Sequence, residues 1–186
     1  MHRLVEDLLL LARSDEQFEL RKEVDVDLDD IMYAEAERVR AITGLTVSTQ
    51  IHPVRVVGDP RALGRLVRNV VDNAIRHANG NIRLECTRLR GYVEIVVADD
   101  GPGVPPDERH RIFDRFVRLD SPRARASGGA GLGLAIVAQI AHAHHGTVEV
   151  SESDSGGAQF VLRLPLVVGQ PVSDTTHRLD AVTRAR

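Results

Sequence analysis

Polar residues recur at helical spacing over Asn69, Asp72, Asn73 and Arg76. Their spacing of i, i+3, i+4 and i+7 places all four on one face of a helix. Carboxamide oxygens are hard, neutral ligands, and Mg²⁺ prefers oxygen ligands while it retains waters and substrate phosphates. Two amides on adjacent turns, with a cation one turn further on, could hold a metal–triphosphate group. A solvated helix face has the same composition, so this helix alone leaves both interpretations open.

A second segment whose residue types could bind a ligand follows an apolar strand and contains Asp99, Asp100, Gly101 and Gly103. A carboxylate at the end of a strand can accept a hydrogen bond from a nucleobase amine. Glycines at that point let the backbone approach a planar ring closely. A tight surface turn also uses Asp and Gly, so this segment is ambiguous by itself.

The third segment places Gly129, Gly131 and Gly133 at the start of an apolar helical stretch. Exposed amides at a helix N-terminus suit phosphate binding. The segment does not fit the dinucleotide-binding pattern, because Leu134 occupies the third glycine position. The alternative is a flexible hinge, which three glycines immediately before a packed helix make less favourable.

Composition excludes several functional classes. Lys22 is the only lysine, and it has neither the P-loop context nor the strand context that the common ATP-binding kinases and NTPases require. Aromatic residues make up 3% and the net charge is -3, which argues against a nucleic-acid-binding role. Cys86 is the only cysteine, so no disulfide and no thiolate metal site is expected.

The hydrophobic pattern predicts an α+β fold in which helices cover one face of a mixed, largely antiparallel sheet. Asp59 followed by Pro60 marks the start of the asparagine-bearing helix. Predicted helices cover 28–41, 60–78, 108–113 and 132–145, and predicted strands cover 23–26, 46–51, 54–57, 82–89, 92–98, 147–150 and 158–164. In the helix over 28–41 the apolar positions are Ile31, Ala34, Val39 and Ile42.

Together these segments resemble the catalytic ATP-binding domain of two-component sensor histidine kinases, a GHKL-type domain related to those of DNA gyrase, MutL and Hsp90-type chaperones. Residues 66–78 resemble the N box, 99–104 the G1 box, 111–118 the F box and 129–137 the G2 box of that family. All four occur in family order. The resemblance implies a two-layer α/β sandwich of the Bergerat type.

The resemblance also implies a division of the chain. Residues 1–14 would end a dimerisation and phosphoacceptor helix, with an apolar stripe at Leu4, Leu8 and Leu11. Residues 15–24 would form a linker, 25–166 the ATP-binding kinase domain, and 167–186 a disordered tail.

By position, the resemblance implies that Asn73 coordinates Mg²⁺ with Asn69 as a second ligand, and that Asp99 accepts from the adenine amine. The other implied ATP contacts are Gly101, Gly103, Val104, Gly129, Gly131, Leu132 and Gly133. Arg76, Arg115 and Arg118 are candidate phosphate contacts. Residues 105–130 would form a lid over ATP, anchored by Phe113 and Phe116, which are expected to be core aromatics.

Histidines outside these boxes have simpler interpretations. His77 follows Arg76 near a helix end and is expected at the surface. His142, His144 and His145 end the last helix, where polar groups suit the negative end of the dipole. No acidic residue lies at ligand spacing from them, so no metal site is predicted there.

Asn69 distinguishes between two activities of this family. In the gyrase-like ATPases a glutamate at this position activates water, and a carboxamide cannot act as a general base at neutral pH. The sequence therefore favours a kinase that passes the γ-phosphoryl group to a positioned histidine. The family's phosphoacceptor pattern begins with a His followed by Glu or Asp, and no histidine of the chain has it. His2, the first histidine, is followed by Arg3.

We therefore expect a fragment of a longer kinase, or one part of a split kinase, that cannot phosphorylate itself alone. The implied partners are ATP, a dimerisation and phosphoacceptor domain on the same or another chain, and a response regulator. The full-length kinase would be a membrane-anchored homodimer with this part on the cytoplasmic side. An anti-sigma-type serine kinase and a non-catalytic dimerisation module remain as alternatives.

Overall fold

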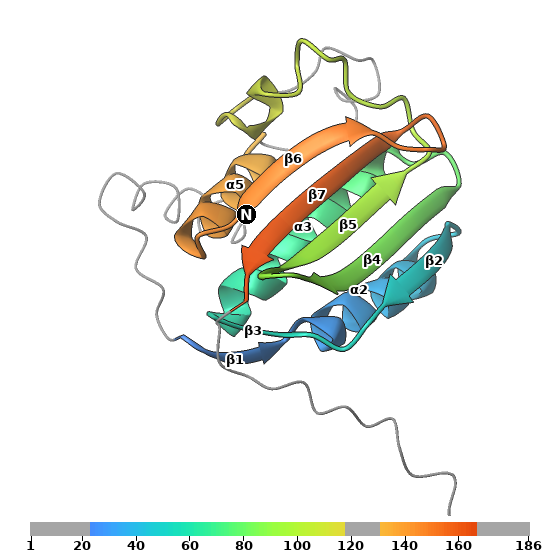
Figure 1. Ribbon diagram of the computed structural model, residues 1–186. Helices are drawn as coiled ribbons and strands as arrows, with labels where there is room; N and C mark the ends of the chain where they lie inside the picture. Colours follow the sequence, from blue (N-terminus) through green and yellow to red (C-terminus); the bar gives the residue numbers. More distant parts are fainter. Residues whose placement is uncertain (1–22, 118–130, 167–186) are drawn as a thin grey trace, which may run out of the picture.

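A five-stranded sheet carries helices on one face (Figure 1). The computed structural model describes residues 23–117 and 131–166. The helices are α2 (Leu28–Ile42), α3 (Pro60–His77), α5 (Gly133–Ala143) and the 3₁₀ helix η2 (Arg111–Phe113). The strands are β1 (Val24–Asp27), β2 (Thr46–Ile51), β3 (Arg55–Gly58), β4 (Asn81–Leu89), β5 (Tyr92–Asp99), β6 (Thr147–Glu152) and β7 (Ala158–Pro165).

The sheet has the order β2-β4-β5-β7-β6, and β1 pairs with β3 in a separate two-stranded sheet. Only the β2–β4 pair of the five-stranded sheet is parallel, and the other three pairs are antiparallel. The predicted two-layer fold and its largely antiparallel sheet are confirmed. Within the part of the chain that the structure describes, no helix is long and apolar enough to cross a membrane.

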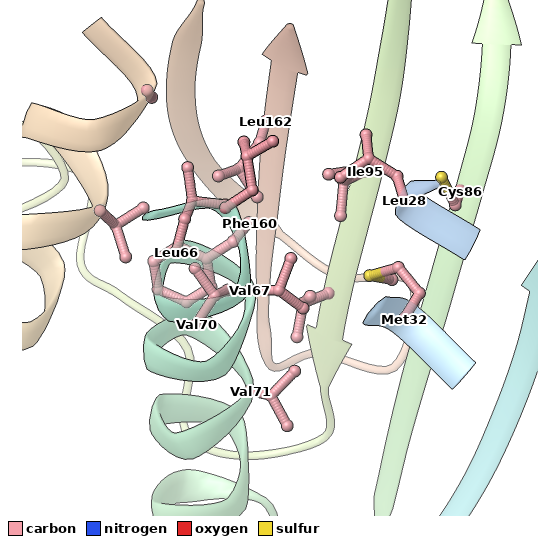
Figure 2. Packing of buried hydrophobic residues seen from close by; sticks show 14 of the residues in the cluster. Leu28, Met32, Leu66, Val67, Val70, Val71, Cys86, Ile95, Phe160 and Leu162 are labelled. Carbon is pink, nitrogen blue, oxygen red and sulfur yellow. The ribbon is translucent and has the colours of Figure 1, made fainter. Parts of the chain in front are cut away.

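Helix α3 begins where the sequence predicts. The Asp59 side chain caps it by accepting hydrogen bonds from the amides of Arg61 (2.8 Å) and Ala62 (3.1 Å). Pro60 occupies the first turn, where its missing N–H costs nothing. The apolar side of α3 is buried, and its residues Leu66, Val67 and Val70 pack beside Phe160 of β7 (Figure 2).

The predicted face of the helix over 28–41 is only partly correct: Val39 is buried and Ile31 packs against the core, but the other two positions do neither. Ala34 is exposed and Ile42 is 63% exposed. Helix α2 instead packs on the sheet through Leu28, Met32, Ala36 and Val39, and Figure 2 shows Leu28 and Met32 near Ile95 and Cys86. This stripe also contains a carboxylate, which the hydrophobic pattern alone does not predict.

That carboxylate belongs to Glu35, which is buried and pairs with Arg38 at 2.6 Å. Arg38 also pairs with Asp72 of α3 at 2.7 Å. A guanidinium shared by two carboxylates in this half-buried position fixes α2 against α3. Asp72 therefore has a structural contact toward α2, although its spacing had grouped it with the asparagines.

Candidate functional site

Asp99 is the last residue of β5, and it is almost completely buried. Its Oδ1 accepts hydrogen bonds from the amides of Gly101 (2.9 Å) and Ala158 (3.3 Å). Its Oδ2 is buried without a hydrogen-bond partner among the described residues. Burial raises the pKa of Asp99, and the bonds from Gly101 and Ala158 oppose that rise. The unmatched acceptor oxygen fits a ligand that supplies an N–H donor, such as an adenine amine.

Asp100, the next residue, has the opposite environment. Its carboxylate accepts from the amides of Asn79 (2.8 Å) and Gly80 (3.0 Å) and from the side chain of Asn81 (2.8 Å). Bonds from Asn81, Gly80 and Asn79 lower the pKa of Asp100 well below its usual range. Asp100 therefore organises the turn between α3 and β4, and only Asp99 has an oxygen available to a ligand.

Gly101 allows the end of α3 to lie against the end of β5. A Cβ at Gly101 would lie 2.4 Å from the His77 carbonyl oxygen and 2.8 Å from Asp99 Oδ1. Any side chain there would separate the two elements. His77, predicted at the surface near the helix end, is half-buried there, and its pKa is lowered by burial first and by Arg76 second.

Asn69 faces the start of α5. A Cβ at Gly133 would lie 3.9 Å from Asn69 Cγ and Oδ1. The Asn69 Nδ2 is buried without a hydrogen-bond partner among the described residues. An amide with unmatched hydrogen-bonding capacity beside a helix N-terminus fits a phosphate or metal–phosphate group. Asn73 is half-buried one turn along α3, and Arg76 is exposed beyond it.

Phe116, inside the predicted lid, contacts Gly131, which follows the lid and precedes α5. The Phe116 amide donates to the Gly131 carbonyl oxygen at 3.0 Å. Both residues have positive φ, 65° and 69°, and a Cβ at Gly131 would lie 3.0 Å from Phe116 Cα. Phe113 packs edge-on against Phe160 with ring centroids 6.4 Å apart, as expected of an anchor.

Phe116 is the exception among the predicted core aromatics, because it is 65% exposed. Its left-handed backbone turns the chain toward Gly131 and leaves the ring outside the core. Arg115 is exposed as well. Arg118, Gly129 and the lid residues 118–130 lie outside the described residues.

The remaining predicted contacts lie around Asp99 and at the start of α5. Val104 packs against the core, and Leu132 is buried immediately before α5. A Cβ at Gly103 would lie 3.4 Å from the carbonyl oxygens of Gly156 and Gly157. The structure thus brings the G1 segment against the turn between β6 and β7.

The sequence predicts no role for that turn. Ser153 is buried and donates from its hydroxyl to the Asp99 main-chain oxygen at 2.8 Å. Serine and glycine are the residues of any surface turn, so the sequence had no signal for this contact.

Comparison with known proteins identifies relatives of this chain. Residues 58–168 match the family described as "Histidine kinase-, DNA gyrase B-, and HSP90-like ATPase". Sensor histidine kinase CpxA of Escherichia coli K12 is 36% identical over 170 residues, which cover 88% of this chain and 36% of the relative. Sensor-like histidine kinase SenX3 of Mycobacterium tuberculosis is 36% identical over 171 residues, covering 89% and 42%. The chain thus spans about two fifths of these curated relatives.

Solved structures give the same result. The ATP-binding domain of PrrB from Mycobacterium tuberculosis has a TM-score of 0.65 and 36% identity, and the match covers 78% of this chain and 98% of that one. Full-length ShkA in complex with AMPPNP has a TM-score of 0.76 and 33% identity, covering 88% and 35%.

Proposed function

Because this chain belongs to the family of histidine kinase-, DNA gyrase B- and HSP90-like ATPases, we propose that it binds Mg·ATP as the catalytic part of a two-component sensor histidine kinase. The observation that carries the proposal is the buried, unmatched Oδ2 of Asp99 at the end of β5. The same region holds Asn69 of α3 against Gly133 of α5. The sheet thus supplies an acceptor for a base, and the helix layer supplies a polar group for phosphates.

Each residue has a definite part in this proposal. Asp99 orients the adenine by accepting from its amine, and Gly101 lets the backbone lie close to the ring. Asn73, with Asn69, would hold Mg²⁺, which when bound neutralises charge on the phosphates. The amides at the start of α5 would bind phosphate oxygens. Asn69 cannot activate water, so the bound phosphoryl group is kept for a protein nucleophile.

The acceptor in this proposal is a histidine on a dimerisation domain, followed by relay to a response regulator. The names of CpxA and SenX3 as sensor histidine kinases support it. In this proposal the whole kinase is a membrane-anchored homodimer, and this part acts on the cytoplasmic side. The chain's own share of the reaction is to bind, orient and donate.

Phosphotransfer to a separate dimerisation domain tests the proposal. The protein is incubated with γ-labelled ATP, Mg²⁺ and the dimerisation domain of its kinase, and Asn73→Ala serves as the control. Acid-labile label on the dimerisation domain, absent with the control variant, is the expected result. ATP binding without any transfer would favour a non-catalytic module.

A further inference from the structure

The turn between β6 and β7 is hydrogen-bonded to the main chain of Asp99. Asp99 lies one residue past Ala98, which forms the last pair of β5 with β7. Its carbonyl oxygen accepts from the Ser153 hydroxyl at 2.8 Å and has the Ser155 hydroxyl at 3.2 Å. On the β7 side, Ser153 thus gives β5 a hydrogen bond one residue beyond the last β5–β7 pair.

The Ser153 hydroxyl has three hydrogen-bond partners, of which the Ser155 hydroxyl, at 2.9 Å, can either donate or accept. The Gly157 amide donates to Ser153 Oγ at 3.0 Å, so this oxygen is an acceptor there. Its single hydroxyl proton points to the Asp99 oxygen, the nearer acceptor at 2.8 Å, when the Ser155 hydroxyl donates to Ser153 Oγ. The Ser153 amide also donates to the Gly157 oxygen at 2.9 Å, which closes the turn. The buried hydroxyl therefore joins the turn to the end of β5.

Gly157 makes this contact tight. A Cβ at Gly157 would lie 2.1 Å from the Asp99 oxygen and 2.6 Å from the Gly101 nitrogen. The next residue, Ala158, donates its amide to Asp99 Oδ1 at 3.3 Å. The turn therefore contacts both the main chain and the side chain of Asp99.

We propose that Ser153 is a positioning residue for base recognition, which holds Asp99 so that its free Oδ2 faces the amine of the nucleotide base. The proposal rests on the function proposed above. Without the hydroxyl, the Gly157 amide and the Asp99 oxygen lose a partner in a buried place. The turn then separates from β5, and the Ala158 bond to the Asp99 carboxylate weakens with it.

Calorimetric titration of four proteins with Mg·AMPPNP tests this role: wild type, Ser153→Ala, Asp99→Asn and the double variant. Ser153→Ala is expected to weaken binding about tenfold, which corresponds to about 1.4 kcal/mol. In the Asp99→Asn background the same change is expected to cost less than about twofold, because the oriented carboxylate is already gone. An equal loss in both backgrounds would overturn the proposal, since a general effect on folding does not depend on Asp99.

The matched control is Ser155→Ala, which removes the longer, 3.2 Å bond to the same Asp99 oxygen from an exposed residue of the turn and is expected to change affinity less than about threefold. Equal losses for Ser153→Ala and Ser155→Ala would contradict the assignment. Purine riboside triphosphate lacks the 6-amine, so its affinity should be nearly the same for wild type and Ser153→Ala. A tenfold loss for this ligand also would show a role unrelated to base recognition.

Two further variants keep the test decisive. Ser153→Thr retains the hydroxyl and is expected to bind within about threefold of wild type. If Ser153→Ala does not fold, Ser153→Cys keeps the shape with a much weaker donor, and undiminished affinity in it would refute the proposal. Failure of the wild type to bind AMPPNP would instead refute the proposed function itself.

Discussion

Asp99 and Asp100 are neighbouring acids whose environments shift their pKa values in opposite directions. Backbone and amide donors surround the Asp100 carboxylate, whereas Asp99 keeps one buried oxygen without a partner among the described residues. A buried carboxylate with unmatched capacity costs stability and persists where a ligand uses it. The cost and the proposed use of Asp99 can therefore be separated by substitution.

We predict that Asp99→Asn stabilises the protein by about 1 kcal/mol at neutral pH while it weakens ATP binding. The Asn oxygen can still accept from Gly101 and Ala158, and no charge is buried. The raised pKa of Asp99 means that the folded state holds its proton more tightly than the unfolded state does. Its contribution to stability therefore falls as pH rises from about 4, the ordinary aspartate value, through the raised pKa.

Urea unfolding of both proteins between pH 4 and pH 8 measures this effect. The stability difference in favour of Asp99→Asn should grow as pH rises through that window and then stay constant. A variant that is less stable than wild type at pH 7 would show that the ionised carboxylate supports the fold.

His145 is a second residue with a conformational cost. It has φ of 56° two residues past the end of α5, and residues with a side chain populate this left-handed region poorly. His145 is exposed, so its ring contributes little to the core. We predict that His145→Gly raises the free energy of unfolding by up to about 1 kcal/mol, measured by urea unfolding. A loss of stability would show that the imidazole makes a contact worth more than the strain.

At the scale of elements, the beginning of α3 is connected to the end of α5, away from the residues proposed to bind the nucleotide. His144 accepts from the Asp59 amide through Nε2 at 3.1 Å, and its Nδ1 lies 2.8 Å from the Ile140 oxygen. Nδ1 must therefore carry the proton. Because Asp59 caps α3, this one imidazole connects the end of α5 to the beginning of α3.

We predict that His144→Ala destabilises the protein by about 2 to 4 kcal/mol, because it removes two buried hydrogen bonds and leaves a cavity beside Gly58. A Cβ at Gly58 would lie 2.6 Å from the His144 ring, so the ring fills that space closely. The control is His142→Ala on the exposed side of the same turn, expected within about 0.5 kcal/mol of wild type. Equal effects in thermal unfolding would reject the proposed link.

The sequence predicts elements better than it predicts their contacts. Cap and turn signals place α3 and the hairpin strands within one or two residues, because they act locally. The buried face of α2 and the contact of Ser153 with Asp99 depend on segments distant in the chain. Asn69 and Asp99 could be selected from spacing and resemblance, but the difference between Asp99 and Asp100 required the surrounding donors.

At the scale of the whole molecule, the sheet keeps its helices on one face and ion pairs on the other. Arg163 of β7 pairs with Glu94 of β5 at 2.9 Å and with Glu149 of β6 at 3.2 Å. These partly exposed pairs bridge neighbouring strands and contribute little each, so the helix-covered core carries the stability. The residues proposed to bind the nucleotide lie at the margin of that core, where α3 meets the end of β5 and the start of α5.

A ligand that binds only the folded state at this junction should stabilise all three elements together. At one hundred times the dissociation constant the gain is about 2.7 kcal/mol, which for a domain of this size raises Tm by roughly 5 to 10 °C. We predict this shift for wild type with AMPPNP and Mg²⁺ in differential scanning fluorimetry, and a smaller shift when EDTA replaces the metal. Asn73→Ala should keep the wild-type Tm without nucleotide within a few degrees, since Asn73 is only half-buried, and lose the part of the shift that depends on Mg²⁺. An Asn73→Ala protein with the full metal-dependent shift would remove Asn73 from the proposed metal site, although Asp99 could still recognise the base.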